Sequence, residues 1–199
     1  MTTSPATGWE VLDTALQGLA TVAGGLSEHD LNLPTPCEQW NVGQLLQHAT
    51  GDQAAWAAAI GGGPGPTENP FTPSGVLGAA PSALVTEATR RADGAWQALR
   101  PDHGEVSTPL PVGPLPVAVA AGACALDAGV HAWDLAVATG QGSPLTESLA
   151  ATLHEAARQV VEPLRGFAYA PALPAEPGDD RVAALLKYLG RRPNWKAAN

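Results

Sequence analysis

Three polar side chains interrupt one long apolar stretch of the chain. Residues 117–140 read VAVAAGACALDAGVHAWDLAVATG, a run of small apolar residues that contains Asp127, His131 and Asp134. Spacings of four and three residues place all three side chains on one face of a helix. A carboxylate buried there without a partner would be costly, so we expect it to meet a cation, a hydrogen-bond donor or water.

A second histidine lies on another segment with a helical pattern. His48, within LLQHATGD, is in phase with Gln44 and Leu45 and is therefore expected to face the same interior. Two imidazoles and one carboxylate from two facing helices would form a three-ligand set for a first-row divalent metal. Such a set leaves coordination positions open, as is typical of a catalytic rather than a structural site.

Simpler interpretations remain open at this point. A single helical histidine is more often a hydrogen-bonded core residue than a ligand, and a histidine four residues from a carboxylate can form a solvated ion pair. Asp52, four residues after His48, and Asp134 are rival ligands or partners that orient a ligand. Spacing alone does not choose among Asp52, Asp127 and Asp134.

Hydrophobic periodicity predicts the helices that position these side chains. Apolar residues recur at the helical period, and no stretch alternates with a period of two over enough residues to form a sheet. The predicted helices span about 9–23, 41–60, 81–99, 117–139, 146–164 and, as a short last helix, 179–189. Long Gly/Pro-rich connections at 61–80 and 101–116 separate them, and the first is long enough to cover a site. The expected fold is all-α, an up-down four-helix bundle with its site between facing helices.

Composition and charge limit the class of protein. The 199 residues contain no second block of distinct composition, so we expect one domain over 1–199. A net charge of -9 disfavours nucleic acid as a partner. No apolar run approaches the roughly 18 residues that cross a bilayer and the start lacks a leader pattern, so we expect no membrane contact and a cytoplasmic location.

The remaining cysteines and histidines carry weaker signals. Cys37 and Cys124 are too few and too far apart for a disulfide framework or a Cys-rich zinc site, so we expect packed or half-exposed thiols. His29, His103 and His154 lie in loop-like or charged surroundings and are expected to be solvated.

Three segments of the chain resemble one family. LPTPCEQWNVGQLLQHATG resembles the TPC-x-x-W-x-V-x-x-L-x-x-H opening of DinB-like proteins related to the N-terminal, metal-binding domain of mycothiol-dependent maleylpyruvate isomerase. DAGVHAWDLAVATG resembles their second motif, in which an acidic residue precedes a histidine by four. LLKYLGRRPNW resembles the G-R-x-P-x-W ending of a stand-alone branch. The three ordered motifs are together far more specific than any one of them, and the resemblance covers nearly the whole chain.

The resemblance implies a DinB/YfiT-like bundle and a ligand set. It assigns a divalent metal, zinc first and nickel, manganese or iron(II) as alternatives, to His48, Asp127 and His131. Catalytic residues beyond these ligands stay unassigned. Asp127 stands where the isomerase usually has Glu, so the metal would lie closer to this helix or be bound through water. The isomerase also carries a C-terminal domain that this chain is expected to lack, so its isomerase activity is not carried over.

The resemblance also implies a function. Related DinB-like enzymes bind a low-molecular-weight thiol to the metal as thiolate and deliver it to an electrophile. We therefore expect a metal-dependent enzyme that acts on a small molecule with a mycothiol-type thiol, by thiol transfer or thiol-assisted isomerisation, as a monomer or homodimer. The alternatives are a metal-assisted hydrolase or cyclase and a non-catalytic protein that binds metal or a small ligand.

Two geometric expectations accompany this assignment. His48 and His131 should lie within about 6 Å of each other, the largest gap that one coordination sphere allows. Asp52 and Asp134 should not contact the metal, and Asp134 should instead hydrogen-bond backbone, Trp or His groups.

Overall fold

The computed structural model describes residues 9–197, and this part of the chain is mostly helical. Its α-helices are α1 (Glu10–Gly24), α2 (Val42–Ala59), α3 (Pro81–Gln97), α4 (Val117–Ala138), α5 (Glu147–Val160) and α6 (Arg181–Tyr188). The expected all-α class is confirmed. Helix ends agree with the predicted ones within a few residues, except that α5 stops at Val160 and a separate 3-10 turn, Glu162–Leu164, follows. Residues 1–8, where we expected no leader pattern, and 198–199 lie outside the described part.

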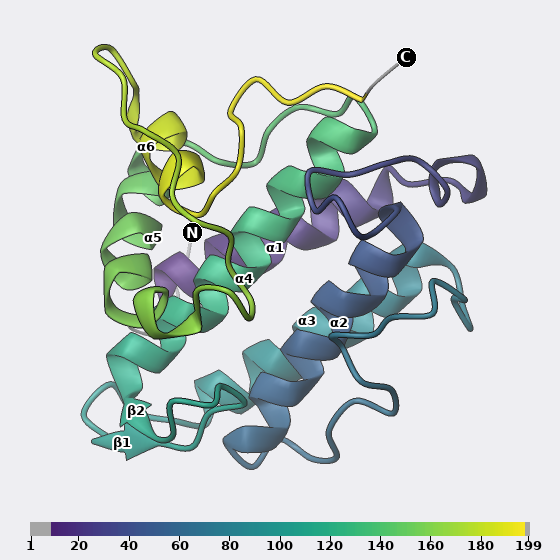
Figure 1. Ribbon diagram of the computed structural model, residues 1–199. Helices are drawn as coiled ribbons and strands as arrows, with labels where there is room; N and C mark the ends of the chain where they lie inside the picture. Colours follow the sequence, from purple (N-terminus) through teal and green to yellow (C-terminus); the bar gives the residue numbers. More distant parts are fainter. Residues whose placement is uncertain (1–8, 198–199) are drawn as a thin grey trace, which may run out of the picture.

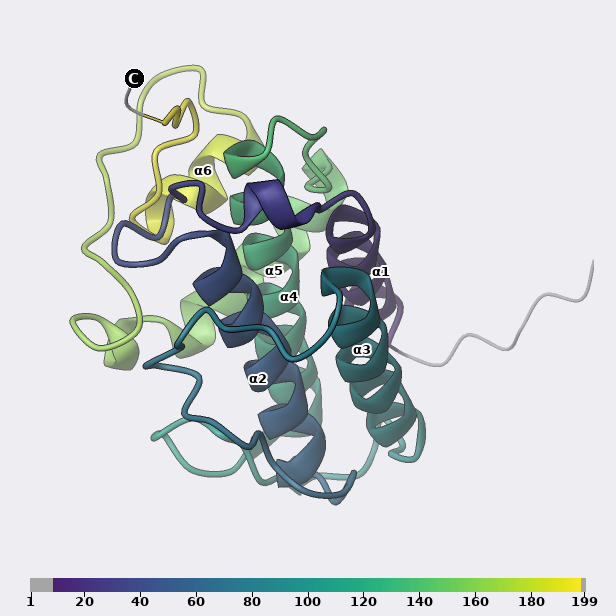
Figure 2. The same cartoon turned by 90° about the vertical axis from the view of Figure 1, so that its right-hand side faces the viewer.

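Four helices form the bundle in an order that differs from their order in the sequence. α1 packs against α3 and α4, and α2 packs against the same two helices, so α1 and α2 lie on a diagonal. Figure 2 shows α1 beside α3 and α2 in front of α4. α5 packs on α4 outside this bundle and α6 packs on α5, on the side away from α2 (Figure 1). The connections α1–α2 and α3–α4 each join helices across a diagonal, whereas the connection α2–α3 joins neighbouring helices.

Local sequence sets where α2 begins. The Asn41 side chain accepts a hydrogen bond from the Gln44 N–H at 2.9 Å, and the Gln44 side chain accepts one from the Asn41 N–H at 3.1 Å. The connection 61–80 passes tightly over this helix start, because a Cβ added to Gly43 would lie 3.1 Å from the Gly75 carbonyl oxygen. The connection is therefore held against the N-terminal end of α2, one to two turns before His48.

α4 is buried on nearly all sides, and its small residues explain how. It lies between α1, α2 and α5. A Cβ added to Gly122 would lie 2.9 Å from the Ala156 side chain, and one added to Gly129 would lie 2.9 Å from Leu153, so α5 approaches α4 closely at both glycines. Although α4 is long and apolar, none of the helices in residues 9–197 meets the length and hydropathy needed to cross a membrane.

One small sheet differs from the sequence expectation. β1 (Glu105–Val106) and β2 (Leu115–Pro116) pair antiparallel within the α3–α4 connection. Each strand has two residues, which is too short to show the alternation that identifies a strand from sequence. The hairpin closes the long connection just before α4 begins.

Candidate metal centre

The three expected ligands come together between α2 and α4. His48 Nε2 and His131 Nε2 face each other at 3.2 Å, and Asp127 Oδ1 lies 3.4 Å from His131 Nε2. The three donor atoms lie within 4.8 Å of one another. Two nitrogen ligands at about 2.0 to 2.1 Å from a tetrahedral zinc would themselves be about 3.3 Å apart. The spacing of the donors therefore fits one coordination sphere.

Each imidazole is fixed by a hydrogen bond at its other ring nitrogen. His48 Nδ1 lies 2.9 Å from the Pro70 carbonyl oxygen, which can only accept, so Nδ1 donates. His131 Nδ1 donates in the same way to Asp134 Oδ2 at 3.0 Å. A neutral imidazole that donates from Nδ1 has a bare lone pair at Nε2. Two lone pairs and the Asp127 carboxylate thus point at one another, an arrangement that requires a proton or a metal cation among them.

The pKa shifts show what a cation would displace. Burial, and then the nearby His131, lowers the pKa of His48 to about 4. Burial also lowers the pKa of His131, but the Asp127 charge and the hydrogen bonds to Asp127 and Asp134 together raise that pKa well above its ordinary value. Burial, and then Asp127, raises the pKa of Asp52 well above its usual range. A divalent cation that binds here must therefore displace a proton from His131.

A buried amide orients the Asp127 carboxylate. Gln53, which is fully buried on α2, donates from Nε2 to Asp127 Oδ2 at 3.0 Å, and its carbonyl oxygen accepts from the Cys124 thiol at 3.3 Å. Asp127 Oδ1 is left facing His131. Asp52, the rival acid, lies 3.6 Å from His48 Nε2. Gln53 therefore fixes the orientation of the Asp127 carboxylate.

Replacing Gln53 by leucine should weaken metal binding about 10- to 100-fold, the usual cost of losing a partner that orients a ligand. The Asp127 carboxylate would lose the donor to Oδ2 and rotate away from the donor set. Competition with a chromophoric chelator measures the change. Gln97→Leu, an exposed glutamine on α3, is the matched control and should bind metal as the parent does. Unchanged affinity in Gln53→Leu would show that Asp127 needs no such support.

A second polar network lies behind His131. Asp134 is fully buried and accepts from Arg191 Nε at 2.9 Å and from Arg191 Nη2 at 2.8 Å. The Cys37 thiol lies 3.4 Å from Asp134 Oδ2 and 3.6 Å from Arg191 Nη2. Burial tends to raise the pKa of Asp134, but Arg191 and then His131 lower it to about 2. Asp134 therefore holds His131 in place from the far side of the ring, in agreement with the expectation that it hydrogen-bonds a histidine.

This second network is a poor place for a metal, although it also contains a potential ligand group. Cys37, His131 and Asp134 offer donor atoms within 4.8 Å of one another. The guanidinium of Arg191 occupies the Asp134 oxygens, however, and its positive charge repels a cation there. The two groups share His131, and the Nε2 side of its ring is the side that faces His48 and Asp127.

Sequence reasoning missed part of this arrangement. No role was predicted for Arg191, although it lies within the G-R-x-P-x-W segment, which was the available signal. Cys37 was expected to be a packed or half-exposed thiol and is half-buried, but its contact with the Asp134 network was not predicted. His29 and His103 are exposed as expected. His154 was wrongly expected to be solvated, because it is half-buried against the Tyr188 ring at 5.0 Å between centroids.

A cavity of about 680 Å³ opens over the three facing donor atoms. The Trp40 ring lies 4.4 Å from the His48 ring, between centroids, and Phe71 lies 5.7 Å from it. Phe71 and the Pro70 carbonyl both belong to the connection 61–80, which was expected to cover a site. That segment therefore both lines the cavity and orients the His48 ring.

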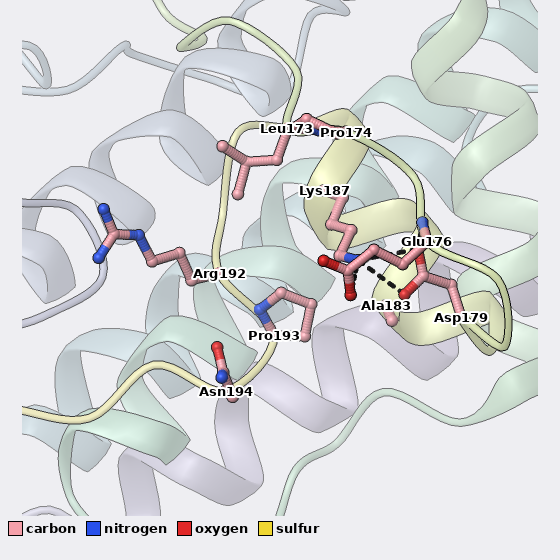
Figure 3. A pocket seen from close by; sticks show the side chains of 9 residues that line it. All are labelled: Leu173, Pro174, Glu176, Asp179, Ala183, Lys187, Arg192, Pro193 and Asn194. Carbon is pink, nitrogen blue, oxygen red and sulfur yellow. Dashed lines mark hydrogen bonds and ion pairs between the residues drawn. The ribbon is translucent and has the colours of Figure 1, made fainter.

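A smaller cavity of about 440 Å³ lies beside α6. Figure 3 shows Lys187 within it, where Nζ is bound by Asp179 at 2.7 Å and by Glu176 at 3.1 Å. Arg192 points away from these charges in the same view (Figure 3). Two groups of potential metal ligands were found within residues 9–197, the one around His48 and the one around Cys37. No residue of either group lines this smaller cavity. The larger cavity is therefore the candidate site.

Comparison with known proteins agrees with the geometry. Residues 12–136 match the family model described as the mycothiol maleylpyruvate isomerase N-terminal domain. Two uncharacterized proteins of Mycobacterium tuberculosis, from strains CDC 1551 / Oshkosh and ATCC 25618 / H37Rv, are each 34% identical over 182 residues, which is 86% of this chain and 92% of theirs. No solved structure matches. The matched range includes His48, Asp127 and His131, whereas Arg191 lies beyond it.

Proposed function

Because this chain belongs to the mycothiol maleylpyruvate isomerase N-terminal domain family, we propose that it is a metal-dependent enzyme that acts on a small molecule with a mycothiol-type thiol as cosubstrate. His48 Nε2, Asp127 Oδ1 and His131 Nε2 would hold one divalent metal, with zinc as the first choice. The reaction would be thiol transfer or thiol-assisted isomerisation in the 680 Å³ cavity. The observation that supports this most directly is the pair of Nε2 atoms that face each other at 3.2 Å beside a carboxylate.

The residues around the cavity have distinct parts in this proposal. A metal, when bound, lowers the pKa of a coordinated thiol below its free value of about 8.5, so that the thiol is present as thiolate at neutral pH. His48 and His131 present their lone pairs because Pro70 and Asp134 hold the opposite nitrogens. Three protein ligands leave a position for the thiol on the cavity side.

The proposed thiol transfer is a substitution at an electrophilic carbon of the second substrate. The thiol proton leaves to solvent, the sulfur lone pair forms a bond to the electrophilic carbon, and the leaving group departs with its electron pair. In an isomerisation the sulfur adds to one carbon of a double bond that is conjugated to an acceptor group, and this group takes up the displaced electron pair. After rotation about the resulting single bond the pair returns, the double bond forms again and the thiolate departs. Trp40, packed against His48, and the apolar walls limit the access of water that would compete with the thiolate.

Thermal shift with and without chelator tests the proposal. Mycothiol at about 100 times its Kd should stabilise the zinc-loaded protein by about 2.7 kcal/mol, or roughly 5 to 10 °C in Tm. Cysteine and S-methylcysteine form a matched pair, because the thioether has no proton to lose and should give no shift. Chelator should abolish the response to every thiol.

Two results would contradict the proposal in different ways. If the purified protein takes up no divalent metal, the proposed metal site is wrong. If the metal-loaded protein responds to no thiol, the proposed thiol cosubstrate is wrong. The function would then be metal-assisted hydrolysis, cyclisation, or ligand binding without catalysis. Cobalt-loaded protein adds an independent readout, because a bound thiolate gives a sulfur-to-metal charge-transfer band.

A further inference from the structure

Both phenylalanines of the chain lie at the opening of the 680 Å³ cavity. Phe71 comes from the connection 61–80 and Phe167 from the segment between α5 and α6, and their ring centroids are 4.9 Å apart. The two residues are 40% and 62% exposed, so the fold itself gains little from burying them. Phe71 also reaches the His48 ring. This phenylalanine pair therefore extends an aromatic surface from solvent to the candidate metal centre.

The apolar surface continues into the cavity. Its wall includes side chains from α2, the 101–116 connection, the end of α5 and the 3-10 turn that follows it. These are Trp56, Leu110, Val160 and Leu164. Small-molecule sites are commonly apolar and aromatic, with a few polar groups that fix orientation. Here the polar groups are concentrated at the metal end, next to His48 and His131.

The charges of the cavity disfavour an anionic ligand. Among the lining residues, all of which the structure describes, Arg191 is the one Lys or Arg, and the buried Asp134 carboxylate neutralises it. Glu38, Asp52 and Asp127 line the same space. A divalent metal balances Asp127 and one thiolate, which leaves no positive charge for a carboxylate or phosphate on the second substrate.

We propose that the electrophile is an uncharged aromatic molecule that binds between the phenylalanine pair and the metal centre. The inference rests on the proposed function, because it names the partner of the thiol. Aromatic rings offer stacked and edge contacts to Phe71 and Phe167 that an aliphatic anion does not. Substrates with a carboxylate or phosphate group, which an arginine-lined pocket would bind, find no unpaired positive charge here.

Two fluorescent probes that share one ring system test the inference. N-phenyl-1-naphthylamine is neutral, and 8-anilino-1-naphthalenesulfonate adds a single sulfonate. We expect the zinc-loaded protein to bind the neutral probe at least about tenfold more tightly. The double variant Phe71→Ala, Phe167→Ala should weaken the neutral probe roughly tenfold. Val76→Ala is the matched control, because Val76 is 75% exposed on the same connection and does not line the cavity.

The outcomes separate this inference from the proposed function. Metal content and the thiol-induced Tm shift are measured on the same samples, and the double variant should retain metal because neither phenylalanine is a ligand. Equal or tighter binding of the sulfonate probe would overturn the inference, as would unchanged affinity for the neutral probe in the double variant. Loss of the metal or thiol response in the parent protein would instead contradict the proposed function.

Discussion

Replacing His131 by alanine should abolish metal retention. His131 offers Nε2 to the donor set and is held at Nδ1 by Asp134, so its loss removes one ligand and the support behind it. We expect affinity to fall at least about a hundredfold, and metal content after gel filtration to fall from about one ion per chain to near zero. The thiol-induced Tm shift should disappear with the metal. Elemental analysis and thermal shift measure the two effects.

A histidine outside the cavity provides the control for this experiment. His154 on α5 is half-buried against Tyr188 and does not line the cavity, so His154→Ala should retain metal. Circular dichroism checks that each variant keeps its helices. Full metal content in a double variant that lacks both His48 and His131 would rule out the proposed site.

The second large effect concerns stability. Asp134→Ala would leave the Arg191 guanidinium, which is 12% exposed, without its buried partner. An unpaired buried charge costs about 3 to 5 kcal/mol, which corresponds to a fall in Tm of roughly 6 to 20 °C for a chain of this length. Metal affinity should fall as well, because His131 loses the acceptor at Nδ1. Chemical denaturation measures the first effect, and chelator competition measures the second.

Removing both charges distinguishes the effect on stability from the effect on the orientation of His131. The double variant Asp134→Leu, Arg191→Leu deletes the ion pair without leaving a lone charge, and should recover most of the lost stability. It should still bind metal about 10- to 100-fold more weakly, because His131 remains without its acceptor. A loss below about 1 kcal/mol in Asp134→Ala would contradict the interpretation, since that is the value of an exposed pair.

The same ion pair predicts a dependence of stability on pH. The pKa of Asp134 is about 2 in the folded chain, against about 3.9 when unfolded. A depressed folded-state pKa stabilises the fold above the unfolded value, and the contribution is lost as pH falls from about 4 through about 2. The shift corresponds to roughly 2.6 kcal/mol. The parent should therefore lose more stability over this window than the Asp134→Leu, Arg191→Leu variant does.

The helices and the three candidate ligands could be predicted because both depend on local patterns. Apolar periodicity identified α1 to α5 nearly to their ends. The spacing of Asp127 and His131 fixed their common face on α4, and the resemblance then chose Asp127 over Asp52 and Asp134. The bond from Gln53 to Asp127 was not predicted, because it depends on how α2 and α4 meet.

The rest of the site comes from segments without periodicity. Pro70 contributes a backbone carbonyl, which no side-chain pattern reveals. Phe71 and Phe167 meet although 96 positions separate their numbers, and each lies in an irregular connection. Arg191 reaches Asp134 after the last helix has ended. Contacts of this kind depend on tertiary packing, which the helical period of a single segment does not encode.

During biosynthesis, Arg191 is added to the chain well after Asp134. Asp134 and Arg191 are 57 positions apart, and a ribosome that adds about 5 to 20 residues per second needs roughly 3 to 11 s to make that interval. During this time the nascent chain holds the Asp134 carboxylate without its cation. A metal captured at that stage would meet a His131 whose acceptor is not yet fixed. We therefore expect the candidate site to reach its final geometry only after the segment that carries Arg191 has been made and has docked on Asp134.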